Sequence, residues 1–219
     1  MKRDFITSAI GIVVLTLFCG ILYPLLITGI SQVAFPGSAN GQQVKVGGKL
    51  VGSQLIGQSF ATQLTKNGKP EVDKNGNPVT QPDPMYFQTR PSATTPPNNA
   101  AATTFSNFGP NNVATEQAIS ANIQAYLALE KPYDPGLTAA KVPVDAANTS
   151  ASGIDPDISV ANAGIQAHRV AAVRHLPLSE VMQLVSKYTG GRGLGFSGEP
   201  GVNVLELNLA LNRMTGVHA

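Results

Sequence analysis

The chain has 219 residues, of which 42% are hydrophobic and 13% charged, and its formal net charge is +2. This near-neutral balance argues against a nucleic-acid partner, because nucleic-acid-binding domains usually carry a strongly basic surface. The single cysteine, Cys19, excludes an intramolecular disulfide and a metal site built from cysteines.

The first predicted element is a transmembrane helix over residues 6–30, after a short tail of residues 1–5. Residues 5–44 contain no Asp, Glu, Lys or Arg. At about 1.5 Å per residue, residues 6–27 would span roughly 33 Å, which is enough to cross a bilayer. The alternative is a signal peptide, whose apolar region runs about 7–15 residues before a cleavage site. The greater length favours a retained anchor, with a kink near Pro24.

The charges beside this helix predict its orientation. Lys2 and Arg3 precede it, and the first charge after it is Lys45. Because positive residues prefer the cytoplasmic side, we expect a cytoplasmic N-terminus and an extracytoplasmic domain over residues 31–219. Lys45 and Lys49 reduce the asymmetry on which this prediction depends.

Short strands and turns are predicted next. Residues 44–59 contain β-branched and apolar residues broken by Gly47-Gly48, which is typical of two strands joined by a tight turn. Residues 65–84 contain Asn67-Gly68 and Asn75-Gly76, and this dipeptide is a strong hairpin signal, so an exposed loop or β-ribbon is expected. Residues 87–110 are rich in Pro, Asn and Thr and are predicted to be irregular.

Helical patterns dominate the second half. Residues 115–130 place Ile119, Ile123, Tyr126 and Leu127 on one face, and Pro132 should end that helix. A second helix is expected over the Ala-rich residues 160–174, and a third over residues 181–188, ending at Gly190-Gly191. The alternating leucines of residues 205–211 favour a half-buried strand, with a short helix as the alternative. The mixture predicts one α+β domain after the membrane helix.

No catalytic or metal motif is found. Gly193, Gly195 and Gly198 match a dinucleotide fingerprint, but they follow a predicted helix and precede Pro200, so a turned loop is the better interpretation. There is no Walker A sequence. The three histidines lack the i, i+4 spacing of a helical metal pair. Nothing resembles a nucleophile elbow, although a Ser/His/Asp triad is recognised by geometry rather than by sequence.

Two polar groups are the candidate site. The loop containing Ser152 and Asp155 leads into the helix of residues 160–174, where such residues either cap the helix or hold a ligand at its start. Gln166 and Arg169 are three residues apart and share a helix face. An amide beside a guanidinium can bind a nucleobase edge, a phosphate or a carboxylate.

Taken together, these segments resemble the C subunit of the bacterial Kdp potassium-transporting P-type ATPase. The matching segments, in chain order, are Tyr23-Pro24, residues 52–58, Phe60, Tyr86-Phe87, residues 90–93, 109–111, 142–145 and 151–153, Asp155-Pro156, Ile158-Ser159, Gln166, Arg169, residues 198–200, 202–205 and 207–212. They occur in family order over nearly the whole chain. Residues 65–84, by contrast, look like an insertion, and residues 98–106 replace a Ser/Gly-rich run of the family.

The resemblance implies a non-catalytic subunit in a bacterial inner-membrane complex that takes up potassium with high affinity by using ATP. Its implied partners are a channel-like potassium-binding subunit and an ATP-hydrolysing pump subunit, together with membrane lipid. The family is described as a catalytic chaperone that raises the ATP affinity of the pump. No intrinsic cofactor is implied, but ATP could be contacted in the complex, with Gln166 and Arg169 matching the family's Gln-x-x-Arg element.

The implied contact with ATP conflicts with the expected orientation, because an extracytoplasmic domain cannot reach cytoplasmic ATP. Assembly and stabilisation of the complex are therefore the firmer expectation. Replacing Arg169 with Ala is expected to impair the complex while the isolated domain stays folded. The alternatives are a membrane-anchored extracytoplasmic hydrolase and an anchored module that binds a small polar ligand.

Overall fold

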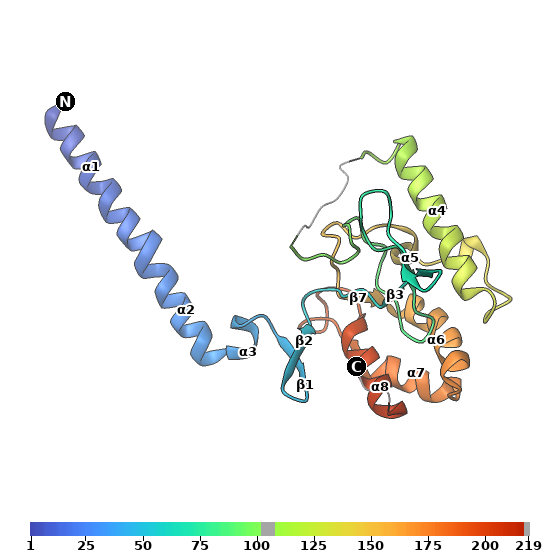
Figure 1. Ribbon diagram of the computed structural model, residues 1–219. Helices are drawn as coiled ribbons and strands as arrows, with labels where there is room; N and C mark the ends of the chain where they lie inside the picture. Colours follow the sequence, from blue (N-terminus) through green and yellow to red (C-terminus); the bar gives the residue numbers. More distant parts are fainter. Residues whose placement is uncertain (102–107, 217–219) are drawn as a thin grey trace. The chain divides into compact units, whose positions relative to one another are not determined.

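The computed structural model describes residues 1–101 and 108–216 and divides the chain into two units, Met1–Val51 and Gly52–Ala219. Figure 1 shows a long helix at the N-terminus of the first unit and a mixed set of helices and short strands in the second. Each unit is described by itself.

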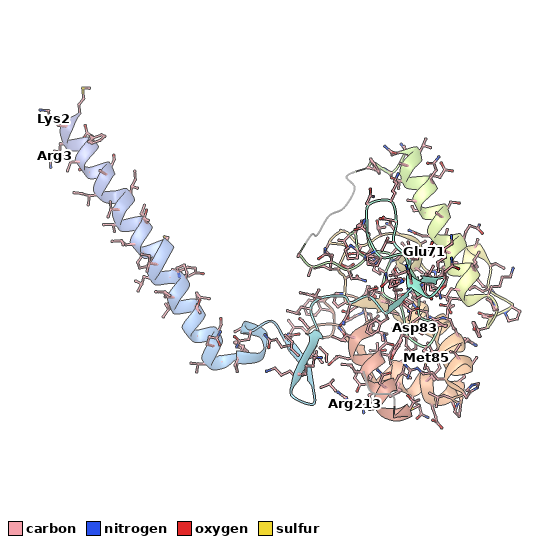
Figure 2. The ribbon with its side chains drawn as sticks, in the orientation of Figure 1. Lys2, Arg3, Glu71, Asp83, Met85 and Arg213 are labelled. Carbon is pink, nitrogen blue, oxygen red and sulfur yellow. The ribbon has the colours of Figure 1, made fainter. Side chains whose placement is uncertain are left out.

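The first unit is built on a continuous helix over Lys2–Ala34, which contains an 18-residue stretch with a mean hydropathy of 2.6 and has no buried residue. It consists of α1 (Lys2–Leu17), a π-helical turn (Phe18–Leu22) and α2 (Tyr23–Ala34). This π-helical turn lies just before Pro24, near which a kink is predicted from the sequence, and in it the N–H of Tyr23 donates to the carbonyl of Phe18. Figure 2 shows Lys2 and Arg3 at the N-terminal end of the helix.

A short helical turn and a hairpin complete this unit. They are α3 (Pro36–Ala39), β1 (Gln43–Val46) and β2 (Lys49–Ser53), and β2 runs into the second unit. Gly47 and Gly48 form the predicted tight turn with φ values of 56° and 80°, which residues with a Cβ rarely adopt.

The globular unit begins with the predicted β-ribbon. Strands β3 (Ala61–Gln63) and β6 (Thr80–Pro82) pair antiparallel, and β4 (Thr65–Lys66) pairs with β5 (Lys69–Pro70). Asn67 and Gly68, with φ values of 53° and 74°, form the turn between β4 and β5. Within residues 87–101 and 108–110 there is no helix or strand, as expected, and residues 102–107 lie outside the described residues.

Helix α4 (Val113–Glu130) follows and ends before Pro132, as predicted. Its apolar face is only half-buried, and its one buried residue is Glu130. A 3-10 turn (Ala139–Lys141) and α5 (Val144–Ala147) lead to a three-stranded antiparallel sheet with the order β7–β9–β8. The strands are β7 (Asp157–Ser159), β8 (Thr189–Gly190) and β9 (Gly201–Asn203).

Three helices connect and follow these strands: α6 (Val160–Arg174), α7 (Leu178–Lys187) and α8 (Val204–Thr215). Helix α7 buries Val181 and Val185 as its apolar spacing predicted. The segment with Gly193, Gly195 and Gly198 is a loop that joins strand β8 to strand β9, and it does not lead directly into a helix. Its interpretation as a turned loop is therefore confirmed.

The strand predicted over residues 205–211 is wrong, because this segment lies in α8. Asn203 caps the helix by accepting a hydrogen bond of 3.1 Å from the N–H of Glu206. The leucines and the residues between them are nearly all buried, with Leu207, Asn208 and Leu211 at 1% exposure or less. A helix enclosed on most sides does not need the one-sided spacing that distinguishes a surface helix from a strand.

The hydrophobic core is made mainly of small and β-branched residues. It comprises Phe87, Ile158, Ala163, Ala167, Val170, Ala171, Val181, Val185, Val202, Val204, Leu207 and Leu211. Alanines on α6 let neighbouring segments approach the helix closely. This close approach brings the polar residues of the same helix into the interior.

Candidate functional site

The first turn of α6 is fixed by hydrogen bonds to Asp145. Ser159 caps the helix, and its Oγ accepts from the N–H of Asn162 at 3.1 Å. The Asp145 carboxylate accepts from the N–H and Oγ of Ser159, both at 2.8 Å, and from Asn162 Nδ2 at 3.0 Å. The capping interpretation of the preceding loop is therefore confirmed at Ser159, which begins the helix that carries Gln166 and Arg169.

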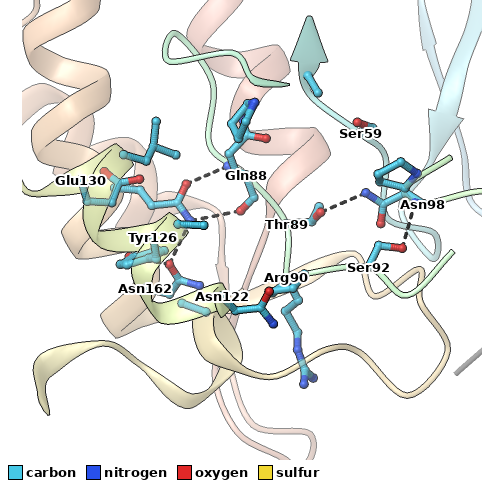
Figure 3. A pocket seen from close by; sticks show the side chains of 18 of the residues that line it. Ser59, Gln88, Thr89, Arg90, Ser92, Asn98, Asn122, Tyr126, Glu130 and Asn162 are labelled. Carbon is cyan, nitrogen blue, oxygen red and sulfur yellow. Dashed lines mark hydrogen bonds between the residues drawn. The ribbon is translucent and has the colours of Figure 1, made fainter. Parts of the chain in front are cut away.

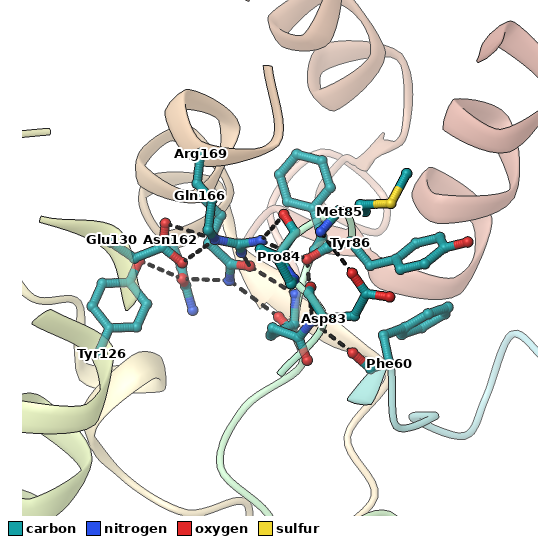
Figure 4. Close-up of polar contacts among 12 residues, drawn as sticks. Phe60, Asp83, Pro84, Met85, Tyr86, Tyr126, Glu130, Asn162, Gln166 and Arg169 are labelled. Carbon is teal, nitrogen blue, oxygen red and sulfur yellow. Dashed lines mark hydrogen bonds and ion pairs between the residues drawn. The ribbon is translucent and has the colours of Figure 1, made fainter. Parts of the chain in front are cut away.

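Arg169 is completely buried and uses all three guanidinium nitrogens (Figure 4). Its Nε donates to both carboxylate oxygens of Glu130, at 2.9 and 3.1 Å. One terminal nitrogen donates to the carbonyls of Pro84 and Tyr86, at 2.6 and 3.0 Å, and the other to Gln166 Oε1 at 3.1 Å. The side chain therefore joins α4, α6 and the segment of residues 84–88.

Gln166 is also buried, and its amide pairs with the backbone of Gln88. Its Nε2 donates to the Gln88 carbonyl at 3.1 Å, and its Oε1 accepts from the Gln88 N–H at 2.7 Å. Asn162 accepts from Gln166 Nε2 and from the Tyr126 hydroxyl, both at 2.9 Å. The side chain of Gln166 thus bonds Gln88 as a neighbouring strand would.

Electrostatics in this cluster follow from burial. Burial raises the pKa of the Glu130 carboxyl, against the opposing attraction of the Arg169 guanidinium. Burial also raises the pKa of Tyr126, and the negative charge of Glu130 adds to this effect. Tyr126 therefore stays a neutral hydrogen-bond donor.

Ser152 and Asp155 lie in a second polar cluster. Asp155 accepts from Ser152 Oγ at 2.9 Å and from the Arg90 guanidinium at 2.9 Å, in an ion pair that is partly exposed. Arg90 also donates to the Thr149 carbonyl at 3.3 Å. Within the described residues, no hydrogen bond joins this cluster to Gln166 or Arg169, so the four candidate residues form two groups.

A cavity of about 300 Å³ is lined by Gln166, the one of the four candidate residues that reaches it (Figure 3). Its lining includes Gln88, Arg90, Asn98, Tyr126 and Gln166. Among the described residues that line the cavity, Arg90 is the one cation, and it is already paired with Asp155. Glu130 also contributes to the wall. The cavity offers amides and hydroxyls for an uncharged polar group, but it lacks the unpaired cations that a triphosphate would require.

Other polar residues that the sequence analysis did not single out complete the cluster. Asn208 on α8 accepts from the N–H of Phe87 and donates to its carbonyl, both at 2.9 Å. Arg174 donates to the Met85 carbonyl at 2.7 Å and lies 4.7 Å from the centre of the Tyr86 ring. Glu130, Arg174 and Asn208 were missed because their partners are far away in the sequence. Only the i, i+4 spacing of Asn208 and Asn212 within the leucine run was a usable signal.

This geometry replaces the expectation that Arg169→Ala leaves the domain folded. The substitution would leave the buried Glu130 without its partner. Removing one member of a buried ion pair is strongly destabilising. Gln166 and Arg169 hold residues 84–88 against α6, and their bonded groups are not directed to solvent.

Comparisons with known proteins agree with the resemblance seen in the sequence. The family model described as the c chain of the K+-transporting ATPase matches residues 5–213. A potassium-transporting ATPase KdpC subunit from Methylococcus capsulatus is 44% identical, over 98% of this chain and 100% of its own. The corresponding subunits from Janthinobacterium sp. and Ralstonia nicotianae are 44% and 46% identical, over 97% and 90% of this chain and 100% and 84% of their own. The chain therefore belongs to the family of the c chain, or KdpC subunit, of the K+-transporting ATPase.

Proposed function

We propose that this membrane subunit is a non-catalytic component of an ATP-driven potassium-uptake complex that assists the assembly and stability of that complex. The observation that carries the proposal is the helix Lys2–Ala34, which is long and apolar and has no buried residue. Such a surface needs lipid or other membrane helices as its surroundings. The named relatives are subunits of a potassium-transporting ATPase, and a subunit acts with other subunits.

A supporting role rather than a catalytic one agrees with the polar interior. The charged centre of the globular unit, Arg169 with Glu130, is buried and bonded within the protein. Among the described residues, no group of three or more His, Cys, Asp or Glu side chains could hold a metal ion. We assign to these buried polar residues a role in stabilising the globular unit, and we assign ATP hydrolysis to the pump subunit.

The proposed partners are the channel-like potassium-binding subunit and the ATP-hydrolysing pump subunit, within the bacterial inner membrane. Lys2 and Arg3 at the N-terminal end of the helix favour a cytoplasmic N-terminus and therefore a globular unit outside the cytoplasm. From there the domain can bind the outer face of the complex and hold its subunits together.

An effect on the pump's ATP affinity is proposed to be indirect. The guanidinium nitrogens of Arg169 and both polar atoms of Gln166 are bonded within the protein. Binding a phosphate would require breaking several buried hydrogen bonds. We therefore assign any chaperone effect to subunit contacts that stabilise the ATP-binding state of the pump, rather than to ATP held by these two residues.

Sidedness is the decisive test of this proposal. A reporter that is active only outside the cytoplasm is fused after Ala219 in the full chain. Activity supports an extracytoplasmic domain and indirect action on the pump. An intact but inactive fusion would overturn the proposed orientation and bring the domain within reach of cytoplasmic ATP.

A matched control reverses the charges that predict the orientation. In Lys2→Asp/Arg3→Asp, the positive residues before the helix are lost while Lys45 and Lys49 remain after it. The reporter signal should fall if those N-terminal charges set the topology. A signal that stays unchanged would show that they do not.

A further inference from the structure

The loop between β8 and β9 exposes two large apolar side chains at its tip. Leu194 is 90% exposed and Phe196 is 75% exposed. Among the described residues of the globular unit, Leu194 is the most exposed large hydrophobic residue and Phe196 the most exposed aromatic one. These two residues, separated only by Gly195, form a local apolar tip, unlike the singly scattered apolar residues of an ordinary surface.

Hydrogen bonds form this tip into a defined turn. The N–H of Gly193 donates to the carbonyl of Ser197 at 2.7 Å, and the N–H of Ser197 donates back at 2.8 Å. Leu194, Gly195 and Phe196 lie between these two residues, and Leu194 and Gly195 have φ values of 52° and 81°, as in hairpin turns that require positive φ. Leucine is unfavourable at positive φ, so its presence there has no local structural benefit.

The charges near the tip are paired at its base. Arg192 donates to Glu199 at 2.8 Å across the two ends of the loop, and residues 193–198 carry no charge. An uncharged tip with one leucine and one phenylalanine can enter an apolar phase without removing a charge from water. Aromatic and leucine side chains are typical of segments that lie in the boundary between headgroups and acyl chains.

The same chain keeps this loop close to a membrane. Residues 35–51 join the helix to the globular unit and, at about 3.4 Å per residue, they can extend to no more than roughly 60 Å. A tethered domain meets the bilayer surface at a high effective concentration, so a weak intrinsic affinity is sufficient. Lipid is the apolar phase that this tether guarantees, on whichever side of the membrane the domain lies.

We propose that the tip of residues 193–198 inserts Leu194 and Phe196 into the lipid surface and so holds the globular unit against the bilayer. The loop acts as a second, reversible membrane contact beside the helix. This contact restricts the orientations of the domain relative to the membrane. It is independent of whether the subunit influences ATP binding.

The absence of tryptophan from the sequence makes a direct test possible, because Phe196→Trp introduces a single tryptophan. The full-length variant is placed in nanodiscs with either ordinary or brominated phosphatidylcholine. Bromine quenches only a fluorophore that reaches the acyl region. We expect the fluorescence of Trp at this position to be quenched by the brominated lipid. Its emission maximum should also lie at a shorter wavelength in nanodiscs than in a reference sample, in which the domain has been released by proteolysis into detergent-free buffer.

Val144→Trp is the matched control, because Val144 is 77% exposed and lies at the start of α5. It should show no spectral shift and no quenching. Adding Leu194→Asp to Phe196→Trp should abolish the quenching, because it places a charge on the tip. Equal quenching at both tryptophan positions would overturn the proposal, as would an unquenched Phe196→Trp.

The same experiment distinguishes lipid from a protein partner as the surface that the tip of residues 193–198 contacts. A spectral shift that occurs only in the assembled potassium ATPase, without quenching by brominated lipid, would place the tip on another subunit and overturn the lipid contact. Quenching of the isolated subunit in nanodiscs would support it.

Discussion

The helix Lys2–Ala34 buries none of its side chains within the protein, whereas the globular unit buries several polar and charged side chains, among them Arg169, Glu130, Gln166 and Asn208. In the helix, apolar side chains face outward and the backbone satisfies its own hydrogen bonds. In the globular unit, Arg169, Glu130, Gln166 and Asn208 each provide hydrogen bonds to groups distant in sequence.

The two regions therefore differ in how specifically their side chains determine the structure. Any apolar side chain of suitable length serves the helix, because its surroundings are lipid. In the globular unit the fixed element is the irregular segment of residues 84–88, which α6 and α8 hold by specific polar bonds. A stretch without regular structure is kept in place by side chains that replace the missing strand neighbours.

The largest expected effect comes from removing the buried cation. Arg169→Met should lower the free energy of unfolding by about 3–5 kcal/mol, because Glu130 stays buried without a partner. The measurement is chemical denaturation of the full chain in detergent, followed through the globular unit. In this variant the pKa of Glu130 remains raised by burial, so the loss should shrink as the pH falls towards the usual glutamate pKa of about 4.3.

Its control is the double variant Glu130→Gln/Arg169→Met, which leaves no charge in the interior. It should recover part of the stability lost in Arg169→Met. A single variant as stable as the original chain, or a double variant that is less stable than the single one, would contradict the buried ion pair as the centre of this network.

A charge introduced into the membrane helix tests the other region. Leu17→Arg should make membrane insertion about 3 kcal/mol less favourable, because an arginine near the centre of a span is costly. The measurement is the fraction of chain that resists alkaline extraction from membranes. Unfolding of the globular unit should not change, because its core is made from residues 87–211 of its own unit. If Leu17→Arg lowered both the membrane insertion of the helix and the stability of the globular unit, the two regions would not be independent.

The regions also differ in how much could be predicted from sequence. The membrane helix, the turns at Gly47-Gly48 and Asn67-Gly68, and helices α4, α6 and α7 follow from local composition and spacing. Helix α8 did not, because leucines that alternate with asparagines match the period of a strand. Its burial on most sides depends on contacts that one sequence does not contain.

The candidate site was predicted only in part, for the same reason. The contact between Gln166 and Arg169 follows from their spacing on one helix, and the two residues do bond each other. Their burial depends on Glu130 and on residues 84–88, which are 39 to 85 positions away along the chain. In the fold, the polar atoms of this pair are hydrogen-bonded to groups within the protein.

Two glycine substitutions have smaller effects of opposite sign. A Cβ on the buried Gly57 would overlap the backbone carbonyl of Asp155, so Gly57→Ala should cost about 1–3 kcal/mol of stability. Gly164 lies within α6 with open space around it, and Gly164→Ala should add about 0.5–1 kcal/mol. Both are measured by denaturation, and a stabilised Gly57→Ala would contradict the close packing of the two loops.

The smallest effect concerns the pH dependence set by Asp157. Loss of hydration at the sheet edge and the nearby negative charge of Asp155 raise its pKa, while a hydrogen bond from Asn203 opposes them. The folded state therefore holds a proton more tightly than the unfolded state, and this contribution to stability is present at low pH and lost as the pH rises through the folded pKa. Asp157→Asn keeps an acceptor for Asn203 and should change stability at neutral pH by no more than about 0.5 kcal/mol, towards greater stability.

Asp73 in the β-ribbon gives this measurement a control of opposite sign. Its carboxylate accepts from the N–H groups of Asn75 and Asn77, at 2.8 and 2.9 Å, and the bonds to Asn77 lower its pKa. Its contribution is present above the unfolded pKa and lost as the pH falls. Both variants and the original chain are denatured at several pH values between acidic and neutral. As the pH falls, the free energy of unfolding of the original chain should rise relative to that of Asp157→Asn and fall relative to that of Asp73→Asn. Slopes of the same sign would show that burial at β7 does not govern the titration of Asp157.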